Sequence, residues 1–484
     1  MNMKKTTAFI LTAATAVMIL PATACKSSDG DKLNSYEITA TYDGENTLEG
    51  AMTFTFFNDT ESEISDLKFN LWGNAYREGA KYSPISEEAA TKAYYDGISY
   101  GEMTVEEVTG CAGWETGGED ENILTVTLPE SVYPDESARI SLTYTLKLAN
   151  VNHRTGVTQK TVNLGNFYPV LCAYDEQGYA ESPYYSSGDP FVSECADYSV
   201  TFNLPKQFTA ATSGKEVSRT VMGDTSTAKY ELSCARDFAA VLSDNFKTRQ
   251  VKADDCDITV YYTGEQPPEN IAECAAESAD YFSDTFGKYA YPTLSVVMTP
   301  LTVSGMEYPA LVMIADDLSA SDGIYTTVHE TAHQWWYAMV GNDQVNCAWQ
   351  DEGLAEYSTL CFFENHPSYG FTRTAMLGTA TKAYRAYFSV YNQIFGKADT
   401  TMTRSLGDFA SDYEYANIAY NKALIMFETL RTSMGDEKFF AALKKYFGEN
   451  KFALAKPENL IAAFDSLYDV EGMIAGFVEG KTVI

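Results

Sequence analysis

Hydrophobic and polar residues alternate with a period of two along the first half of the chain. The alternation is clearest in the segments 36–42, 48–56, 67–71, 124–128, 140–148 and 198–204. Successive side chains of a β-strand point to opposite faces, so a half-buried strand shows this period. Strands at this density, separated by Asn, Asp and Gly turns, predict an antiparallel β-sandwich domain over residues 35–252. We expect an insertion at 73–118, where an Ala/Glu run precedes several glycines.

The pattern changes near residue 265, where the spacing of hydrophobic residues becomes helical. Pro267 and Pro268 precede an amphipathic run that begins at Ile271, and Gly287 ends it, as proline and glycine commonly do at helix ends. Strand-like runs follow at 294–299 and 310–314, and helices are predicted from about Ile324 and over 352–364, 416–433, 436–447 and 457–468. The predicted fold class is therefore multidomain α+β, with a second, α/β domain at 253–484 that becomes helical.

The predicted helix that starts near Ile324 carries two of the four histidines in the chain, His329 and His333. Residues i and i+4 lie one turn apart on the same helix face, so both imidazoles can point at one ion. Glu330 lies about 100° further round the helix, beside the ion, where a general base would stand. This is the His-Glu-x-x-His zinc signature. The alternative is a pair of surface histidines, but the apolar flanking residues favour a buried helix wall.

A catalytic zinc usually takes three protein ligands and leaves one position open. Glu352, which eighteen intervening residues separate from His333, opens a helical run and is the predicted third ligand. Glu356 lies one turn further and could orient a ligand histidine, or it could be a solvated helix glutamate. The predicted site therefore holds one Zn²⁺ per chain, on His329, His333 and Glu352.

At this point the chain resembles a known family, the aminopeptidase-N type zinc peptidases, which include the leukotriene hydrolase. Residues 304–308 read Ser-Gly-Met-Glu-Tyr where the family has Gly-Ala-Met-Glu-Asn, and the zinc ligands have the family spacing. Residues 349–355 read Trp-Gln-Asp-Glu-Gly-Leu-Ala, which is similar to the family's Trp-Leu-Asn-Glu-Gly-Phe-Ala. Residues 419–423 resemble the family's Tyr-x-Lys-Gly stretch. Residues 188–191, Gly-Asp-Pro-Phe, precede a strand as in the family's β domain.

The resemblance implies a thermolysin-like catalytic domain at 253–484, without the large C-terminal helical domain that many members carry. It also implies roles for individual residues. Glu330 is the general base, and Tyr420 donates a hydrogen bond to the developing oxyanion, with Tyr415 as the second choice. Glu307 binds the free α-amine of the substrate.

The resemblance also implies that the loop that carries Glu307 supplies backbone contacts to the substrate, from Gly305 and Met306. The alternative interpretation of Glu307 is a loop glutamate paired with a surface lysine. The loop departs from the family in Tyr308, where the family has asparagine. A second amine-binding acid, which many members carry on the β domain, has no assigned residue here.

Charge and cysteine content bear on the compartment. The net charge of −33 argues against nucleic acid as a partner, because nucleic acid requires basic patches. Lys4 and Lys5 precede an apolar run at 8–20 that ends before Cys25, which has the pattern of a signal peptide at 1–24. The small residues before Cys25 resemble a bacterial lipobox, so Cys25 is the predicted lipidation site and 25–34 a flexible tether. A conventional cleavage that leaves a secreted protein is the alternative. The eight remaining cysteines contain no C-x-x-C pair, and their spacing predicts no pairing.

The sequence therefore predicts a membrane-anchored zinc aminopeptidase on the extracytoplasmic face of a bacterial cell. Its expected partners are peptides with a free N-terminus and, through the lipid on Cys25, the membrane. Two alternatives stay open. One is a zinc endopeptidase or another hydrolase that uses the same site, and the other is a catalytically silent lipoprotein that binds peptide.

Overall fold

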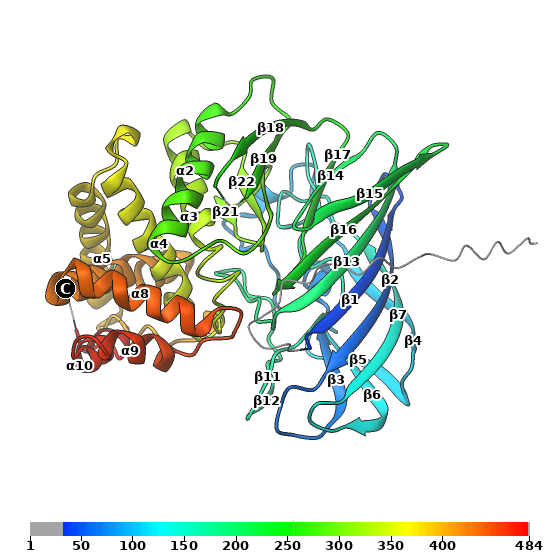
Figure 1. Ribbon diagram of the computed structural model, residues 1–484, viewed down its shortest axis with the longest axis horizontal. Helices are drawn as coiled ribbons and strands as arrows, with labels where there is room; N and C mark the ends of the chain where they lie inside the picture. The colour runs from blue at the N-terminus through cyan, green and yellow to red at the C-terminus, as the bar shows by residue number, and fades with distance from the viewer. Residues whose placement is uncertain (1–31, 255, 483–484) are drawn as a thin grey trace, which may run out of the picture. The chain divides into compact units, whose positions relative to one another are not determined.

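The computed structural model describes residues 32–254 and 256–482, which form one compact unit. The predicted signal peptide, Cys25 and most of the predicted tether lie outside the described residues, and the first strand already begins at Asn34. Figure 1 shows strands in the N-terminal half and helices in the C-terminal half, as the two sequence periods predict. Over 32–254 and 256–482, no helix combines the length and the apolarity that a membrane span requires.

The largest sheet of the N-terminal half has seven strands in the order β15-β16-β13-β1-β2-β7-β4. Its strands are β1 (Asn34–Tyr42), β2 (Thr47–Phe57), β4 (Glu102–Thr109), β7 (Ser137–Lys147), β13 (Ala196–Pro205), β15 (Lys215–Met222) and β16 (Thr225–Ala235). Neighbouring strands are antiparallel except β1 and β13, which run parallel. The predicted antiparallel sandwich therefore contains one parallel pair, which sequence alternation cannot reveal because both pairings share the period of two.

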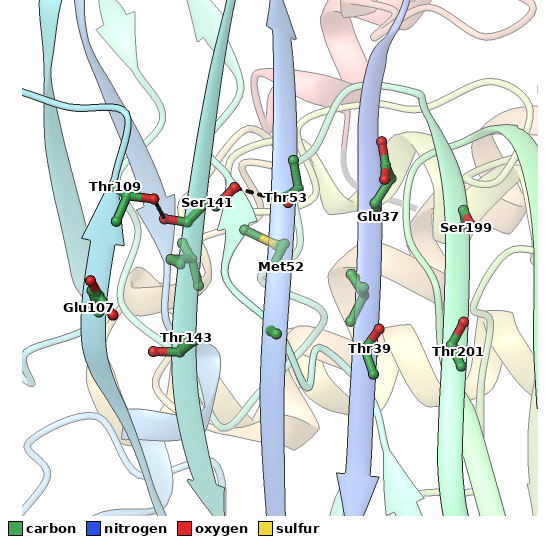
Figure 2. Close-up of a pocket in the computed structure, with 13 residues that line it drawn as sticks. Glu37, Thr39, Met52, Thr53, Glu107, Thr109, Ser141, Thr143, Ser199 and Thr201 are labelled. Atoms are coloured by element: carbon green, nitrogen blue, oxygen red, sulfur yellow. Dashed lines mark hydrogen bonds between the residues drawn. The ribbon is translucent and has the colours of Figure 1, made fainter. Parts of the chain in front are cut away.

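The two faces of this sheet differ as the alternation predicts. The inner face packs on a four-stranded sheet of β10 (Val170–Leu171), β3 (Ile64–Asn70), β6 (Ile123–Val132) and β5 (Gly113–Gly117). Phe54 and Phe69 bring their ring centroids to 5.3 Å across this core. Figure 2 shows the opposite face, where hydroxyls line neighbouring strands and Thr53 and Ser141 form a 2.9 Å hydrogen bond. Hydrophobic burial therefore holds the sheet on one side only.

The insertion predicted at 73–118 is wrong for its second half. Strand β4 is the edge strand of the seven-stranded sheet, and β5 pairs with β6. Between Val105 and Glu107 a bulge shifts the register of β4, so the buried residues Met103, Val105 and Val108 do not keep a strict period of two. The irregular spacing hid the strand, because one extra residue moves later side chains to the other face.

Two smaller sheets connect the β-rich half to the helical half. One contains β14 (Thr209–Thr212), β17 (Ala240–Ser243), β9 (Val162–Leu164) and β8 (Thr155–Val157). The other has the order β18-β19-β20-β22-β21, from β18 (Lys247–Lys252), β19 (Asp257–Tyr262), β20 (Thr293–Thr299), β21 (Gly305–Met306) and β22 (Leu311–Ala315). The boundary predicted after residue 252 falls between β18 and β19, which pair with each other.

The helices that follow include the predicted ones, with small shifts at their ends, and others for which no bounds were predicted. They are α2 (Glu269–Thr285), α3 (Ala320–Ala332), α4 (Ala348–Asn365), α5 (Arg373–Phe395), α6 (Asp412–Tyr415), α7 (Ala423–Met434), α8 (Asp436–Asn450), α9 (Pro457–Asp465) and α10 (Glu471–Val478). A π-helix at Ala416–Lys422 joins α6 to α7. The sequence predicted one regular helix over 416–433, because a single π-helical turn leaves little trace in hydrophobic spacing.

Arg236 joins three segments that are distant in the sequence. Its buried guanidinium donates to the carbonyl oxygens of Ser193 (3.0 Å), Tyr337 (2.8 Å) and Ala453 (2.5 Å). We expect Arg236→Met to lower the free energy of unfolding by about 3 kcal/mol or more, because three buried carbonyls lose their donor. Urea denaturation measures this. Arg139→Met, which removes an exposed ion pair, should change the stability by less than about 1 kcal/mol.

Candidate active site

Helices α3 and α4 carry the predicted zinc ligands. Ser319 caps α3 by accepting a hydrogen bond from the amide of Asp322 (3.2 Å), which satisfies one of the free amides at a helix start. The helix buries Val328 and Ala332 in the core and ends at His333. Helix α4 is buried on almost every side, as expected of a helix inside the domain. Core packing therefore fixes both helices, and with them the positions of the polar side chains that they carry.

The three predicted ligands converge on one point. Nε2 of His333 lies 3.1 Å from Nε2 of His329, and both nitrogens lie 3.2 Å from Oε2 of Glu352. All three residues are at most 8% exposed. Nδ1 of His333 lies 2.9 Å from the carbonyl oxygen of Trp336, a contact that fixes the ring orientation when Nδ1 carries the proton. The structure thus brings together the residues that the His-Glu-x-x-His spacing and Glu352 predicted.

The donor set fits zinc. Tetrahedral zinc with ligand distances of about 2.0–2.1 Å places its donor atoms about 3.3 Å apart, close to the 3.1–3.2 Å separations of the three atoms. Two imidazole nitrogens and one carboxylate oxygen are also the donors that a catalytic zinc site uses, with one position left for water. The same three residues form a group whose ligand atoms lie within 4.8 Å of one another.

The charges at the triad keep Glu352 ionised. Burial alone would raise the pKa of Glu352, but the two histidines lower it below its ordinary value. Burial works against a positive charge on His333, yet Glu352 raises the pKa of that imidazole well above its ordinary range. Burial likewise disfavours His329 as a cation, while hydrogen bonds to Glu352 and Glu356 raise its pKa to about 10. The carboxylate therefore attracts positive charge to this point, as a cation site requires.

Glu330 lies next to the triad, on the side where β21 passes. Its side chain is buried, and Oε2 has no hydrogen-bond partner within residues 32–254 and 256–482. Burial raises the pKa of Glu330 to about 8. Gly305 of β21 approaches so closely that a Cβ there would lie 2.3 Å from Oε1 of Glu330. The backbone of β21, the edge strand of its sheet, therefore limits where this carboxylate can stand.

We expect Gly305→Ala to lower kcat by about tenfold or more, because the methyl group would displace Glu330 from its position and small misplacements of catalytic groups are costly. The zinc content should stay at one ion per chain, since Gly305 is not a ligand. Steady-state kinetics together with elemental analysis checks both results. A kcat equal to that of the wild type would show that the Glu330 side chain tolerates displacement.

Glu356 lies one turn after Glu352 on α4 and faces His329. Its Oε2 lies 3.2 Å from Nδ1 of His329, and the hydroxyl of Tyr325 donates a hydrogen bond to its Oε1. A carboxylate behind a ligand histidine holds the ring and raises its basicity. The structure thus favours the predicted orienting position of Glu356 over that of a solvated helix glutamate.

Tyr420 stands over the triad, on the π-helix. Its hydroxyl donates a hydrogen bond to Oε1 of Glu352, and its ring stacks on His329 with centroids 5.8 Å apart. Burial raises the pKa of Tyr420 well above its ordinary value, so the hydroxyl keeps its proton. Tyr415 packs edge-on against Tyr420 at 5.7 Å, and its hydroxyl has no partner in the described part of the chain. Tyr420 is the nearer of the two predicted tyrosines to the ligands.

Glu307 follows β21 and lies close to His333. It is 4% exposed and forms, with His333 and Asp351, a group whose ligand atoms lie within 4.8 Å of one another. Oε1 of Glu307 accepts a 3.1 Å hydrogen bond from the side-chain amide of Gln344. Met306 is fully buried, so its side chain is part of the core. The alternative of a glutamate paired with a surface lysine is therefore wrong, because Glu307 is buried beside the histidine ligand.

Sequence reasoning missed four polar residues around Glu307. Asp351 accepts a 2.7 Å hydrogen bond from Gln344, and burial raises its pKa to about 7. Arg154 and Asp189 form a buried ion pair of 2.5 Å. Asp351 replaces the asparagine of the family motif, and Asp189 lies in the Gly-Asp-Pro-Phe stretch. Both residues could therefore have been found from the motifs. Nothing in the spacing of Arg154 or Gln344 pointed to the site.

Comparison with known proteins agrees with this geometry. Residues 271–479 match the family model "Peptidase family M1 domain". Aminopeptidase M1-B from Oryza sativa subsp. japonica is 23% identical over 291 residues, and Aminopeptidase M1-C from the same plant is 23% identical over 293 residues. Each match spans 56% of this chain and 32% of the relative, so the chain covers about a third of the length of these relatives.

Solved structures extend the likeness to nearly the whole chain. The M1 zinc metallopeptidase from Deinococcus radiodurans aligns with a TM-score of 0.64 at 17% identity, over 93% of this chain and 94% of that one. A mutant of that protein bound to a Tyr-Ser-Ala substrate aligns with a TM-score of 0.63 at 18% identity, over 93% and 95%. These likenesses show the fold, a β-rich N-terminal domain followed by a thermolysin-like catalytic domain. Together with the matched domain and the fit of the triad to zinc, they confirm the resemblance that the motifs indicated: residues 271–479 form a peptidase family M1 domain, on a chain whose fold is that of an M1 zinc metallopeptidase.

Proposed function

We propose that this protein is a zinc aminopeptidase that removes residues from the N-terminus of peptides. The observation that carries the proposal is the position of Glu307, a buried carboxylate whose oxygen lies within 4.8 Å of a ring nitrogen of the ligand His333 but which is not part of the triad. A buried anion at a set distance from the metal selects a substrate whose α-ammonium lies one residue away from the bond to be cleaved, because a buried charge needs a partner.

Each polar group at the site has a task in peptide hydrolysis. When bound, zinc supplies Lewis-acid polarisation of the scissile carbonyl and activation of water. The Glu330 carboxylate, held against Gly305, takes the proton from the attacking water and delivers it to the leaving nitrogen. The Tyr420 hydroxyl donates a hydrogen bond to the developing oxyanion after it leaves Glu352. Glu307 holds the α-ammonium, so it positions the first peptide bond at the reacting centre.

The test compares free and acetylated N-termini. We expect Glu307→Ala to lower kcat/KM for an aminoacyl anilide by about 10²-fold, since a hydrogen bond to a charged group contributes about 1.5–3 kcal/mol. Hydrolysis of the N-acetylated anilide should not change. The exposed Glu437→Gln serves as the control for a lost negative charge. If the wild-type protein cleaves acetylated and free substrates equally, the site is that of an endopeptidase or another hydrolase.

We also propose that the mature chain is anchored by lipid to the extracytoplasmic face of a bacterial membrane. The support is the sequence alone: the basic residues Lys4 and Lys5, the short apolar run and Cys25 after small residues, a pattern of exported proteins. Expression with labelled palmitate should label the wild-type chain and leave Cys25→Ser unlabelled and released from membranes. Equal release of both chains would favour the secreted alternative.

A further inference from the structure

The side chain of Gln344 lies between the two carboxylates next to His333. Its Nε2 donates to Oε1 of Glu307 at 3.1 Å and to Oδ2 of Asp351 at 2.7 Å. An amide nitrogen has two N–H donors, so both are used. The side chain is 1% exposed, and burial of this kind leaves no room for it to swing out to solvent. Gln344 therefore bridges two acidic groups from two separate segments of the catalytic domain.

This bridge determines which way the amide faces. Turning it over would place the carbonyl oxygen against two carboxylates, where oxygen would meet oxygen without a proton between them. With Nε2 on the carboxylates, Oε1 is directed elsewhere. It is buried and finds no donor in the stretches 32–254 and 256–482. A buried acceptor without a donor loses the hydrogen bonds that water would give it, so a donor from outside the chain would be bound favourably there.

The acidic residues around Oε1 of Gln344 favour a positively charged donor. Glu307, Asp351 and Glu330 are acidic and close to this region, and the guanidinium of Arg154 is paired with Asp189. Nε2 of Gln344 contacts the Glu307 carboxylate at 3.1 Å, and Oε1 belongs to the same amide group. The two oxygens are therefore close enough for one ammonium nitrogen to contact both. A primary ammonium group, with one positive charge and three N–H donors, satisfies both acceptors at once.

We propose that Gln344 is a second contact for the α-ammonium of the substrate and a determinant of specificity for free N-termini, an inference that rests on the proposed aminopeptidase function. Its carbonyl oxygen accepts one N–H of the ammonium, while its amide nitrogen holds Glu307 in place to accept another. Asp351 keeps the amide in this orientation, and Asn342 in turn donates to Oδ1 of Asp351 at 3.1 Å. The family motif has asparagine at the position of Asp351, so the arrangement differs from that motif.

The experiment measures two substrates with the wild-type protein, Gln344→Leu and Gln344→Glu. One substrate is the L-leucine anilide, and the other is its analogue without the amino group. We expect Gln344→Leu to lower the ratio of kcat/KM for the two substrates by about tenfold or more, because only the amino substrate loses the contact. The change should appear mainly in KM. Gln344→Glu keeps the length of the side chain and replaces the leucine variant if that variant folds poorly. It should also lower the ratio, because a glutamate carboxylate cannot donate to Asp351.

Gln350→Leu is the matched control. Gln350 is also 1% exposed, also has a buried carbonyl oxygen without a partner in the described chain, and donates to Tyr446 and Ala455 away from Glu307. Its replacement should lower stability but leave the substrate ratio unchanged. A wild-type protein that cleaves both substrates equally would contradict the proposed function itself. The role of Gln344 would be overturned if the wild-type protein prefers the amino substrate and both Gln344→Leu and Gln344→Glu keep that preference. It would also be overturned if the protein binds two zinc ions per chain, with one between Glu307 and Asp351.

Discussion

Replacing Glu330 with glutamine should lower kcat by about 10³-fold or more, within the range of about 10²–10⁴ that general acid–base catalysis contributes. The substitution keeps the shape of the side chain but removes the basic oxygen that accepts the proton. Glu330 is buried, and the backbone at Gly305 limits its movement. Glutamine therefore occupies the same position without the chemistry, and neither KM nor stability should change much.

Elemental analysis shows whether the activity is lost with the base alone or because zinc is lost. Glu330→Gln should bind one zinc ion per chain, like the wild type, because the triad consists of the other three side chains. Glu364→Gln, which changes a glutamate in ion pairs with Arg373 and Arg431 away from the triad, should keep the wild-type kcat. Loss of zinc from Glu330→Gln would mean that Glu330 is itself a ligand.

Replacing His333 with alanine should remove both zinc and activity. His333 lies within 3.2 Å of the donor atoms of both other ligands, and its ring is held through Nδ1 by the Trp336 carbonyl. Even residues behind the ligands alter metal affinity by about 10–100-fold, so loss of a ligand should exceed this. We expect zinc below detection after dialysis and kcat/KM lower by about 10³-fold or more.

His366 provides a control for His333→Ala. Its Nδ1 also lies against a backbone carbonyl, that of Phe362 at 2.8 Å, but it is outside the triad. His366→Ala should keep one zinc ion per chain and wild-type kinetics. A His333→Ala protein that retains zinc at wild-type affinity would show that the metal is held by other residues, such as the group of Glu307 and Asp351.

The elements of the fold that follow from local periodicity were predicted from the sequence. The strands of the β domain alternate along one buried face, and the strands and helices predicted after residue 267 lie within a few residues of their expected ends. No bounds were predicted for β21, α5 and α10. The parallel pairing of β1 with β13 and the bulged strand β4 were not predicted, because pairing partners and bulges depend on contacts between segments far apart in the chain.

The sequence by itself predicted the two histidine ligands and the general base, because His329, Glu330 and His333 lie within two turns of one helix, whose geometry is local. The spacing after His333 added Glu352, and the family motifs added Tyr420 and Glu307. Only the tertiary structure decided which uncharged or paired residues complete the site. Gln344 and Arg154 belong to segments without a local signal. Gln344 meets Glu307 within the catalytic domain, and Arg154 meets Asp189 within the β domain, through the folding of segments that are distant in the sequence. The position of a side chain one turn away is set by the helix, whereas that of a side chain on another segment is set by the packing of the core.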